Sequence, residues 1–135
     1  MIFMLDTNSC IYLLNRSIGY ENILAKIDGL AYEQVVISSL TLAELKYGIA
    51  KSVKKEANRI KLEYFLYQFE CLPFDTDATS CYGDIRVQLE SKGTPIDPLD
   101  TLIAAHALSL SATMVTNNAR EFECVEGLAL ENWIN

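Results

Sequence analysis

The chain has 135 residues, of which 50% are hydrophobic, and its 18 acidic and 11 basic side chains give a formal net charge of −7. This length suits one domain with its own core, and we expect residues 1–135 to form a single domain. Six glycines and three prolines are too few for a disordered or collagen-like chain, and no apolar run approaches the roughly 18 residues of a membrane span.

Four short apolar segments are predicted to be strands. They are Ile2–Leu5, Val35–Ile37, Cys71–Phe74 and Thr113–Thr116. Because they are apolar throughout, they are typical of strands that are covered on both faces in a parallel sheet. The first segment has no basic leader and ends at Asp6, so we interpret it as a strand and not as a signal peptide. The closing stretch, Gly127–Trp133, is expected to form a short last strand.

Segments with helical periodicity alternate with these strands. They are Asn8–Asn15, Glu21–Ile27, Leu42–Lys51, Lys55–Phe69, a segment from Thr76 or Asp77 to Ser91, and Pro98–Leu110. In the fourth helix, an apolar stripe is expected from Ile60, Tyr64, Phe65, Tyr67 and Phe69. The alternation predicts an α/β fold with three α/β/α layers around a central, mostly parallel sheet of four to five strands.

Polar, mostly acidic side chains follow the predicted strands. Asp6 follows the first strand, and Glu44 lies in the helix after the second. Asp100 lies in the first turn of the helix at Pro98, and Glu121 comes shortly after the last strand. Ligands of open parallel sheets bind at the carboxyl ends of the strands, where we expect these acids to gather. Gathered carboxylates repel one another unless a cation lies among them, so the pattern predicts a Mg²⁺ or Mn²⁺ site that can attract a phosphodiester.

Each of these acids also has a purely structural interpretation. Asp6 could cap the helix that starts near Asn8, and Glu44 could be a hydrogen-bonded group among apolar neighbours. Asp97 suits the N-cap of the following helix, with Asp100 as its capping-box partner. Glu121 could be a solvated surface acid. The joint placement of the acids, and no single one, favours the metal site.

Other catalytic chemistries find little support. Ser-His-Asp and Cys-His schemes would both need His106, the single histidine, which we expect to be packed and hydrogen-bonded. Glycine-rich phosphate loops are absent. The four cysteines are scattered without a C-x-x-C pair, which favours free, buried thiols in a reducing cytoplasm over disulfides or zinc.

A basic segment interrupts the acidic chain. Six of the 11 basic residues fall within 16 residues: Lys46, Lys51, Lys54, Lys55, Arg59 and Lys61. Such a cluster is either a solvated helical face or a stripe that contacts phosphates or a partner.

Four stretches of the chain resemble known motifs. They are residues 4–8 (MLDTN), 37–48 (ISSLTLAELKYG), 93–107 (GTPIDPLDTLIAAHA) and 115–122 (VTNNAREF). Their order and spacing are similar to those of PIN-domain proteins, and more narrowly to VapC toxins of the bacterial VapBC toxin–antitoxin systems. The resemblance runs nearly from end to end and includes the closing Gly127–Trp133 stretch.

The resemblance implies a Mg²⁺-dependent endoribonuclease, in which Mn²⁺ could substitute. Asp6, Glu44 and Asp100 match the first three acids of the family pattern, with Asp6 and Asp100 as metal ligands. The place of a fourth acid holds Asn117 and Asn118, and the resemblance implies that Glu121 supplies the missing carboxylate. Four polar residues would orient the metal ligands without binding the metal themselves: Thr7, Asn8, Thr116 and Asn117. Asp97 is a further departure from the family pattern.

The resemblance also implies a substrate and partners. The most similar-looking members cut the initiator tRNA in its anticodon stem-loop, and a phosphate-contacting stripe is expected from Lys46, Lys51, Lys54 and Lys55. A VapB-type antitoxin and a homodimer are implied, in the cytoplasm and without a membrane. Five aromatic residues either supply an apolar groove for the RNA and the antitoxin or belong to the core: Tyr47, Tyr64, Phe65, Tyr67 and Phe69.

Three other functions are compatible with parts of this pattern to different degrees. A phosphoryl-accepting signalling domain would need a lysine after the late strand, where Asn117 and Asn118 stand. A catalytically impaired PIN-like module that only binds RNA or an antitoxin stays open because of those same asparagines. A deoxyribonuclease with the same metal chemistry is hardly separable by sequence.

Overall fold

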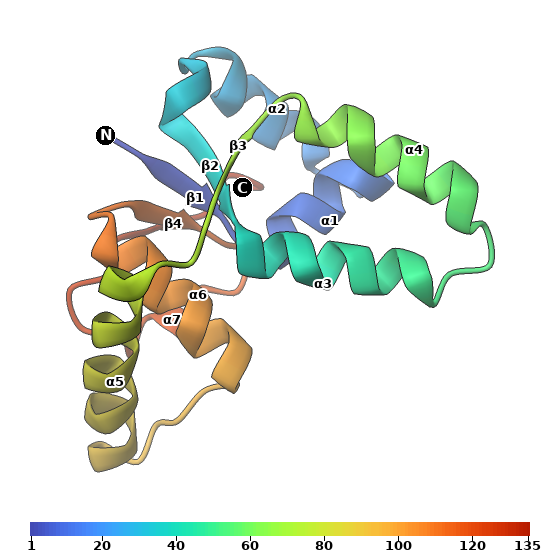
Figure 1. Ribbon diagram of the computed structural model, residues 1–135. Coiled ribbons are helices and arrows are strands. Elements are labelled where there is room, and N and C mark those ends of the chain that lie inside the picture. The colour runs from blue at the N-terminus through green and yellow to red at the C-terminus, as the bar shows by residue number, and fades with distance from the viewer.

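Five parallel strands form one sheet in the order β3-β2-β1-β4-β5, in a computed structural model that describes residues 1–135 (Figure 1). The strands are β1 (Phe3–Leu5), β2 (Val35–Ser38), β3 (Glu70–Leu72), β4 (Thr113–Val115) and β5 (Leu130–Glu131). Met4 of β1 lies between Val36 of β2 and Met114 of β4. The predicted sheet is therefore confirmed, with every pairing parallel and five strands.

Seven α-helices and one 3₁₀ turn connect the strands. They are α1 (Thr7–Asn15), α2 (Tyr20–Asp28), the turn Tyr32–Gln34, α3 (Ser39–Ala50), α4 (Lys55–Leu66), α5 (Thr76–Ser91), α6 (Pro98–Ser109) and α7 (Ala119–Phe122). No helix is both long and apolar enough to cross a membrane. The order of strands and helices agrees with the predicted α/β class.

The two faces of the sheet pack against different helices, which makes three layers. Phe3, Leu5 and Ile37 point into one apolar cluster, which holds buried residues of α1, α2, α3 and α4. Met4 and Val36 point into the other, which holds buried residues of α5, α6 and α7. Alternate residues of one strand thus enter opposite cores, as the β-strand period of two requires. This explains why the central strands are apolar throughout.

Several predicted boundaries are wrong by a few residues. Helix α3 begins at Ser39 and not at Leu42, because the Ser38 hydroxyl caps it by accepting a hydrogen bond from the Leu40 amide at 3.1 Å. Strand β3 ends at Leu72, one residue before Pro73, which lacks the N–H that a ladder needs. The four-residue helix α7 was not predicted, because so short a segment has no readable periodicity.

The predicted apolar stripe of α4 divides into a buried and an exposed part. Phe65 and Phe69 are buried, with ring centroids 4.8 Å apart. Ile60, Tyr64 and Tyr67 face solvent, so their assignment to one packed stripe is wrong. The cysteine expectation is also only partly right, because all four thiols are free but only Cys10 is fully buried.

His106 is packed in the core, as expected. Its Nδ1 lies 2.8 Å from the Ser38 hydroxyl, and its ring meets the Phe74 ring edge-on with centroids 5.6 Å apart. Burial lowers the pKa of His106, which favours the neutral ring. The contact joins α6 to the end of β2, beside the start of α3.

The orientation of α4 gives a stability prediction. Phe65→Ala should lower the free energy of unfolding by about 3–5 kcal/mol, because it leaves a cavity beside Phe69. The neighbouring change Tyr64→Ala removes an exposed ring and should change it by about 0.5 kcal/mol or less. Urea unfolding of both variants measures the difference, and equal losses would contradict the orientation of this helix.

Candidate functional site

Asp6 lies where β1 passes into α1. Its amide donates to the Val115 carbonyl of β4 at 3.0 Å, and its Oδ1 accepts from the Ser9 amide at 2.8 Å. The side chain is therefore the N-cap of α1, as one interpretation of the sequence held. Asp6 is only 4% exposed, and this burial raises the pKa of its carboxyl, while hydrogen bonds from Thr116 and Ser9 oppose the rise. The cap thus fixes a buried acid at the carboxyl end of the central strand.

Glu44 is joined to the start of α1 through Thr7. The Thr7 hydroxyl lies 2.6 Å from Glu44 Oε1, to which it donates, and 3.3 Å from the Thr41 hydroxyl. Both Thr41 and Glu44 lie on α3, so one side chain at the first position of α1 contacts two residues of another helix. This contact directs the Glu44 carboxylate toward the carboxyl end of β1.

Asp100 of α6 and Glu121 of α7 form a carboxyl pair. Burial raises the pKa of Asp100 to about 8, with further contributions from its hydrogen bond to Glu121 and from the charges of Glu121, Asp97 and Glu44. A hydrogen bond between two carboxyl groups requires a proton on one of them. The charge of Glu121 also raises the pKa of Asp6. Asp6, Glu44, Asp100 and Glu121 are therefore one electrostatic cluster, which we call the acidic centre.

The side chain of Glu121 is held by its own helix. Asn118 precedes α7, and its Nδ2 donates to Glu121 Oε2 at 2.8 Å. The Asn118 amide donates in turn to the Thr116 hydroxyl at 2.9 Å. The role of Asn118 was missed by sequence reasoning, although an asparagine three residues before a glutamate is a known sign of a helix start.

Of the remaining polar residues that were predicted to belong to the site, some lie beside Asp6 and others lie away from it. Thr116 is buried and hydrogen-bonds to Asp6. Asn8 and Asn117 line a shallow cavity on the side of α1 together with Ile11 and Tyr12, and neither side chain hydrogen-bonds to the acidic centre. Asp97 is the N-cap of α6, accepting from the Leu99 amide at 2.9 Å, which agrees with its predicted capping role.

The donor set of the acidic centre fits a hard divalent cation. None of its four acids takes part in an ion pair, since the ion pairs of the chain involve only other carboxylates. No group of three or more His, Cys, Asp and Glu side chains lies in an arrangement that could hold a metal ion. Mg²⁺ typically keeps several waters and takes only one or two carboxylates, so a complete protein cage is not required. A cation here would offset the charges of these neighbouring carboxylates.

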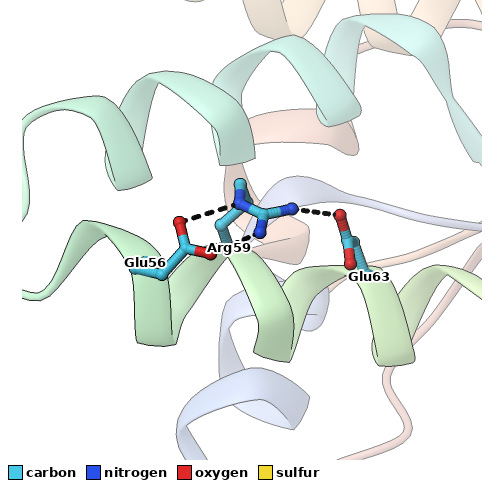
Figure 2. A network of polar contacts seen from close by, with 3 residues as sticks. All are labelled: Glu56, Arg59 and Glu63. Carbon is cyan, nitrogen blue, oxygen red and sulfur yellow. Dashed lines mark hydrogen bonds and ion pairs between the residues drawn. The ribbon is translucent and has the colours of Figure 1, made fainter.

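The predicted basic stripe lies along α3, α4 and the turn between them. Lys46, Lys51, Lys54 and Lys55 are all exposed. Arg59 is different, because it pairs with Glu56 and Glu63 on either side of it in α4 (Figure 2). Its charge is locally neutralised, whereas the four lysines form no ion pair.

The chain is similar to known proteins over nearly its whole length. Residues 3–128 match the sequence profile of the PIN domain. The chain is 47% identical to ribonuclease VapC2 of Rickettsia felis, over 98% of both chains. It is 44% identical to the tRNA(fMet)-specific endonuclease VapC of Salmonella typhimurium, over 97% of both. A crystal structure of DNA-bound VapBC from Salmonella typhimurium superposes with a TM-score of 0.92 at 43% identity, covering 98% of each chain.

The carboxyl pair makes stability depend on pH. In the folded state the pKa of Asp100 is about 8, above its ordinary value of 3.8. Its contribution to stability is therefore complete below pH 3.8 and is lost as the pH rises through about 8. Asp100→Asn removes this loss, so in EDTA the variant should be more stable than the wild type above pH 8, with the difference shrinking toward pH 4.

Urea unfolding in EDTA across this range measures the effect. Asp84→Asn, which changes an exposed acid of α5, is the matched control and should show no such pH-dependent difference. A constant difference between Asp100→Asn and the wild type at all pH values would contradict the shared proton.

Proposed function

The chain belongs to the PIN-domain family and, within it, to the VapC ribonucleases, and from this premise we propose that it is a Mg²⁺-dependent endonuclease of tRNA. As a member of this family, the chain is the ribonuclease toxin of a VapBC toxin–antitoxin system.

The observation that carries the proposal is the pairing of Asp100 with Glu121. The family pattern lacks its usual fourth acid in this chain, because Asn117 and Asn118 follow Thr116 at the end of β4. Helix α7 brings Glu121 to the same carboxyl cluster, and Asn118 donates a hydrogen bond to it at 2.8 Å. The acidic centre therefore has four carboxylates, which supports an active nuclease over a catalytically impaired binding module.

The position of each residue in the acidic centre suggests its role in catalysis. Asp6 and Asp100 would hold the cation, and Thr116 and the Ser9 amide keep the Asp6 carboxylate in place. Glu44, held by Thr7, would orient the attacking water or complete a second cation site. When bound, Mg²⁺ supplies the positive charge that polarises the phosphodiester and acidifies a water. Because attack by water does not need the ribose 2′-hydroxyl, we expect 5′-phosphate and 3′-hydroxyl ends.

The proposed substrate is supported by the name of a similar protein and by the exposed positive charges of this chain. The Salmonella relative is named as a tRNA(fMet)-specific endonuclease, and we propose the initiator tRNA as the substrate of this chain as well. Bases can be read by a protein most readily in single-stranded loops, such as an anticodon loop. The exposed lysines of the α3–α4 region would contact phosphates, which the net charge of −7 otherwise repels.

The partners follow from the same relatives. Solved structures similar to this chain are complexes of VapB with VapC, and we propose a VapB-type antitoxin as the partner. We further propose a homodimer that acts in the cytoplasm, where tRNA is found.

Cleavage of total tRNA by antitoxin-free protein tests the function. Discrete cuts are expected with Mg²⁺ or Mn²⁺ and none with EDTA. Asp6→Asn, Asp100→Asn and Glu121→Gln should each lower the rate by about 100-fold or more, since each removes a charge from the acidic centre. Asp84→Asn should cleave at the wild-type rate. Mapping the cut ends identifies the RNA and the product chemistry.

Two outcomes would overturn the proposal. Cuts that persist in both aspartate variants would come from a contaminating nuclease. Folded protein that neither cleaves nor binds Mn²⁺, measured by calorimetry, would be the impaired binding module instead.

The contact between Thr7 and Glu44 gives a separate prediction. Thr7→Val removes a hydrogen bond to a charged group while keeping the side-chain shape, so kcat should fall about tenfold with little change in KM. Thr7→Ser restores the hydroxyl and should recover most of the activity. If Thr7→Val and Thr7→Ser are equally impaired, the hydroxyl has no positioning role.

A further inference from the structure

One side of α3 carries residues that extend from the acidic centre along the helix axis. Glu44, Tyr47 and Lys51 follow one another at spacings of three and four residues, from the middle of this helix to its C-cap. Residues at these spacings lie above one another on one side of an α-helix. Seven residues of helix span about 10 Å, so Lys51 lies roughly that far from Glu44 along the helix axis.

On this side of α3, Tyr47 and Lys51 are exposed to solvent. Leu45 and Ile49 point the other way, into the apolar cluster that includes Leu62 and Phe65 of α4. Tyr47 is 66% exposed, although it is a large aromatic residue. Figure 1 shows α4 running alongside α3. An exposed ring beside a catalytic acid is thus available to a substrate.

Tyr47 and Lys51 also contact each other. The Lys51 Nζ lies 4.8 Å from the centroid of the Tyr47 ring, a cation–π distance. The contact covers part of the ring and keeps a positive charge beside it, while the Tyr47 hydroxyl makes no hydrogen bond. Proteins bind single-stranded nucleic acid with this combination, in which a base stacks on an aromatic ring and a cation contacts the phosphate.

The charges near Tyr47 favour a phosphate-bearing ligand. Lys46, Lys51, Lys54 and Lys55 form no ion pair, whereas Arg59, the nearby cation of α4, is neutralised by two glutamates. Positive charge that is not satisfied within the chain therefore concentrates at the end of α3. A polyanion is the complementary ligand.

We propose that Tyr47 and Lys51 form a nucleotide subsite, in which the Tyr47 ring stacks on an unpaired base next to the cleaved phosphodiester and Lys51 contacts that nucleotide's phosphate. The subsite rests on the proposed ribonuclease function and adds to it the residues that bind the RNA strand beside the cut. It acts in substrate binding, so its loss affects RNA affinity more than the chemical step.

Binding of a short single-stranded RNA that contains 2-aminopurine tests the subsite. The protein carries Asp6→Asn, which prevents cleavage, and fluorescence reports both affinity and stacking. Tyr47→Ala should weaken binding by about tenfold and abolish the quenching of 2-aminopurine, while Tyr47→Phe should retain both. Tyr64→Ala is the matched control, because it removes an equally exposed ring from α4. Lys51→Gln should reduce the slope of log affinity against log salt by about one.

The outcomes separate the subsite from the function on which it rests. If Tyr47→Ala binds like Tyr64→Ala while the otherwise wild-type chain cleaves tRNA, the subsite is refuted and the nuclease stands. If the otherwise wild-type chain neither cleaves nor binds RNA, both are refuted. If Tyr47→Ala leaves RNA binding intact and weakens only the affinity for the antitoxin, measured by calorimetry, the ring belongs to a protein interface and the proposal is overturned.

Discussion

Mutual repulsion among carboxylates at the carboxyl end of the sheet is the constraint around which this protein is arranged. Asp6, Glu44, Asp100 and Glu121 come from four separate parts of the chain, and no ion pair neutralises any of them. Burial is the largest cause of the raised pKa of Asp6 and of Asp100, and the charges of neighbouring carboxylates add to it. A divalent ion would compensate both effects, so the burial and crowding that disfavour charged carboxylates in the metal-free fold favour metal binding.

Local hydrogen bonds keep the repelling groups in place. Asp6 accepts from the first turn of α1, Glu44 accepts from Thr7 at the beginning of that helix, and Glu121 accepts from Asn118 just before α7. Asp100 lies in the first turn of α6, behind the cap made by Asp97. Helix starts present unpaired N–H groups and a partial positive charge, which partly offset the repulsion between neighbouring acids. Placing Asp6, Asp100 and Glu121 at helix starts therefore lets one end of the sheet hold several acids.

Charge is distributed to match an RNA substrate despite the net charge of −7. Glu44 of the acidic centre lies in the middle of α3, and Lys51 lies at the C-terminal end of the same helix. A cation at the acidic centre would extend the positive region from the α3–α4 turn to these acids. Under the proposed function, bound metal thus makes a site attractive to phosphates that without metal would repel them.

The sequence by itself determined the class of the fold and the order of its elements, because short apolar runs, helical periodicity and caps such as Asp97-Pro98 are local signals. It also pointed to the four acids of the candidate site, Glu121 included, since residues that follow parallel strands share one edge of the sheet. Only the tertiary structure decided that Glu121 meets Asp100, that Phe65 is buried while Tyr64 is exposed, and that Arg59 is neutralised and Lys51 is not. These depend on which face a helix presents and on contacts between distant segments, which no short pattern encodes.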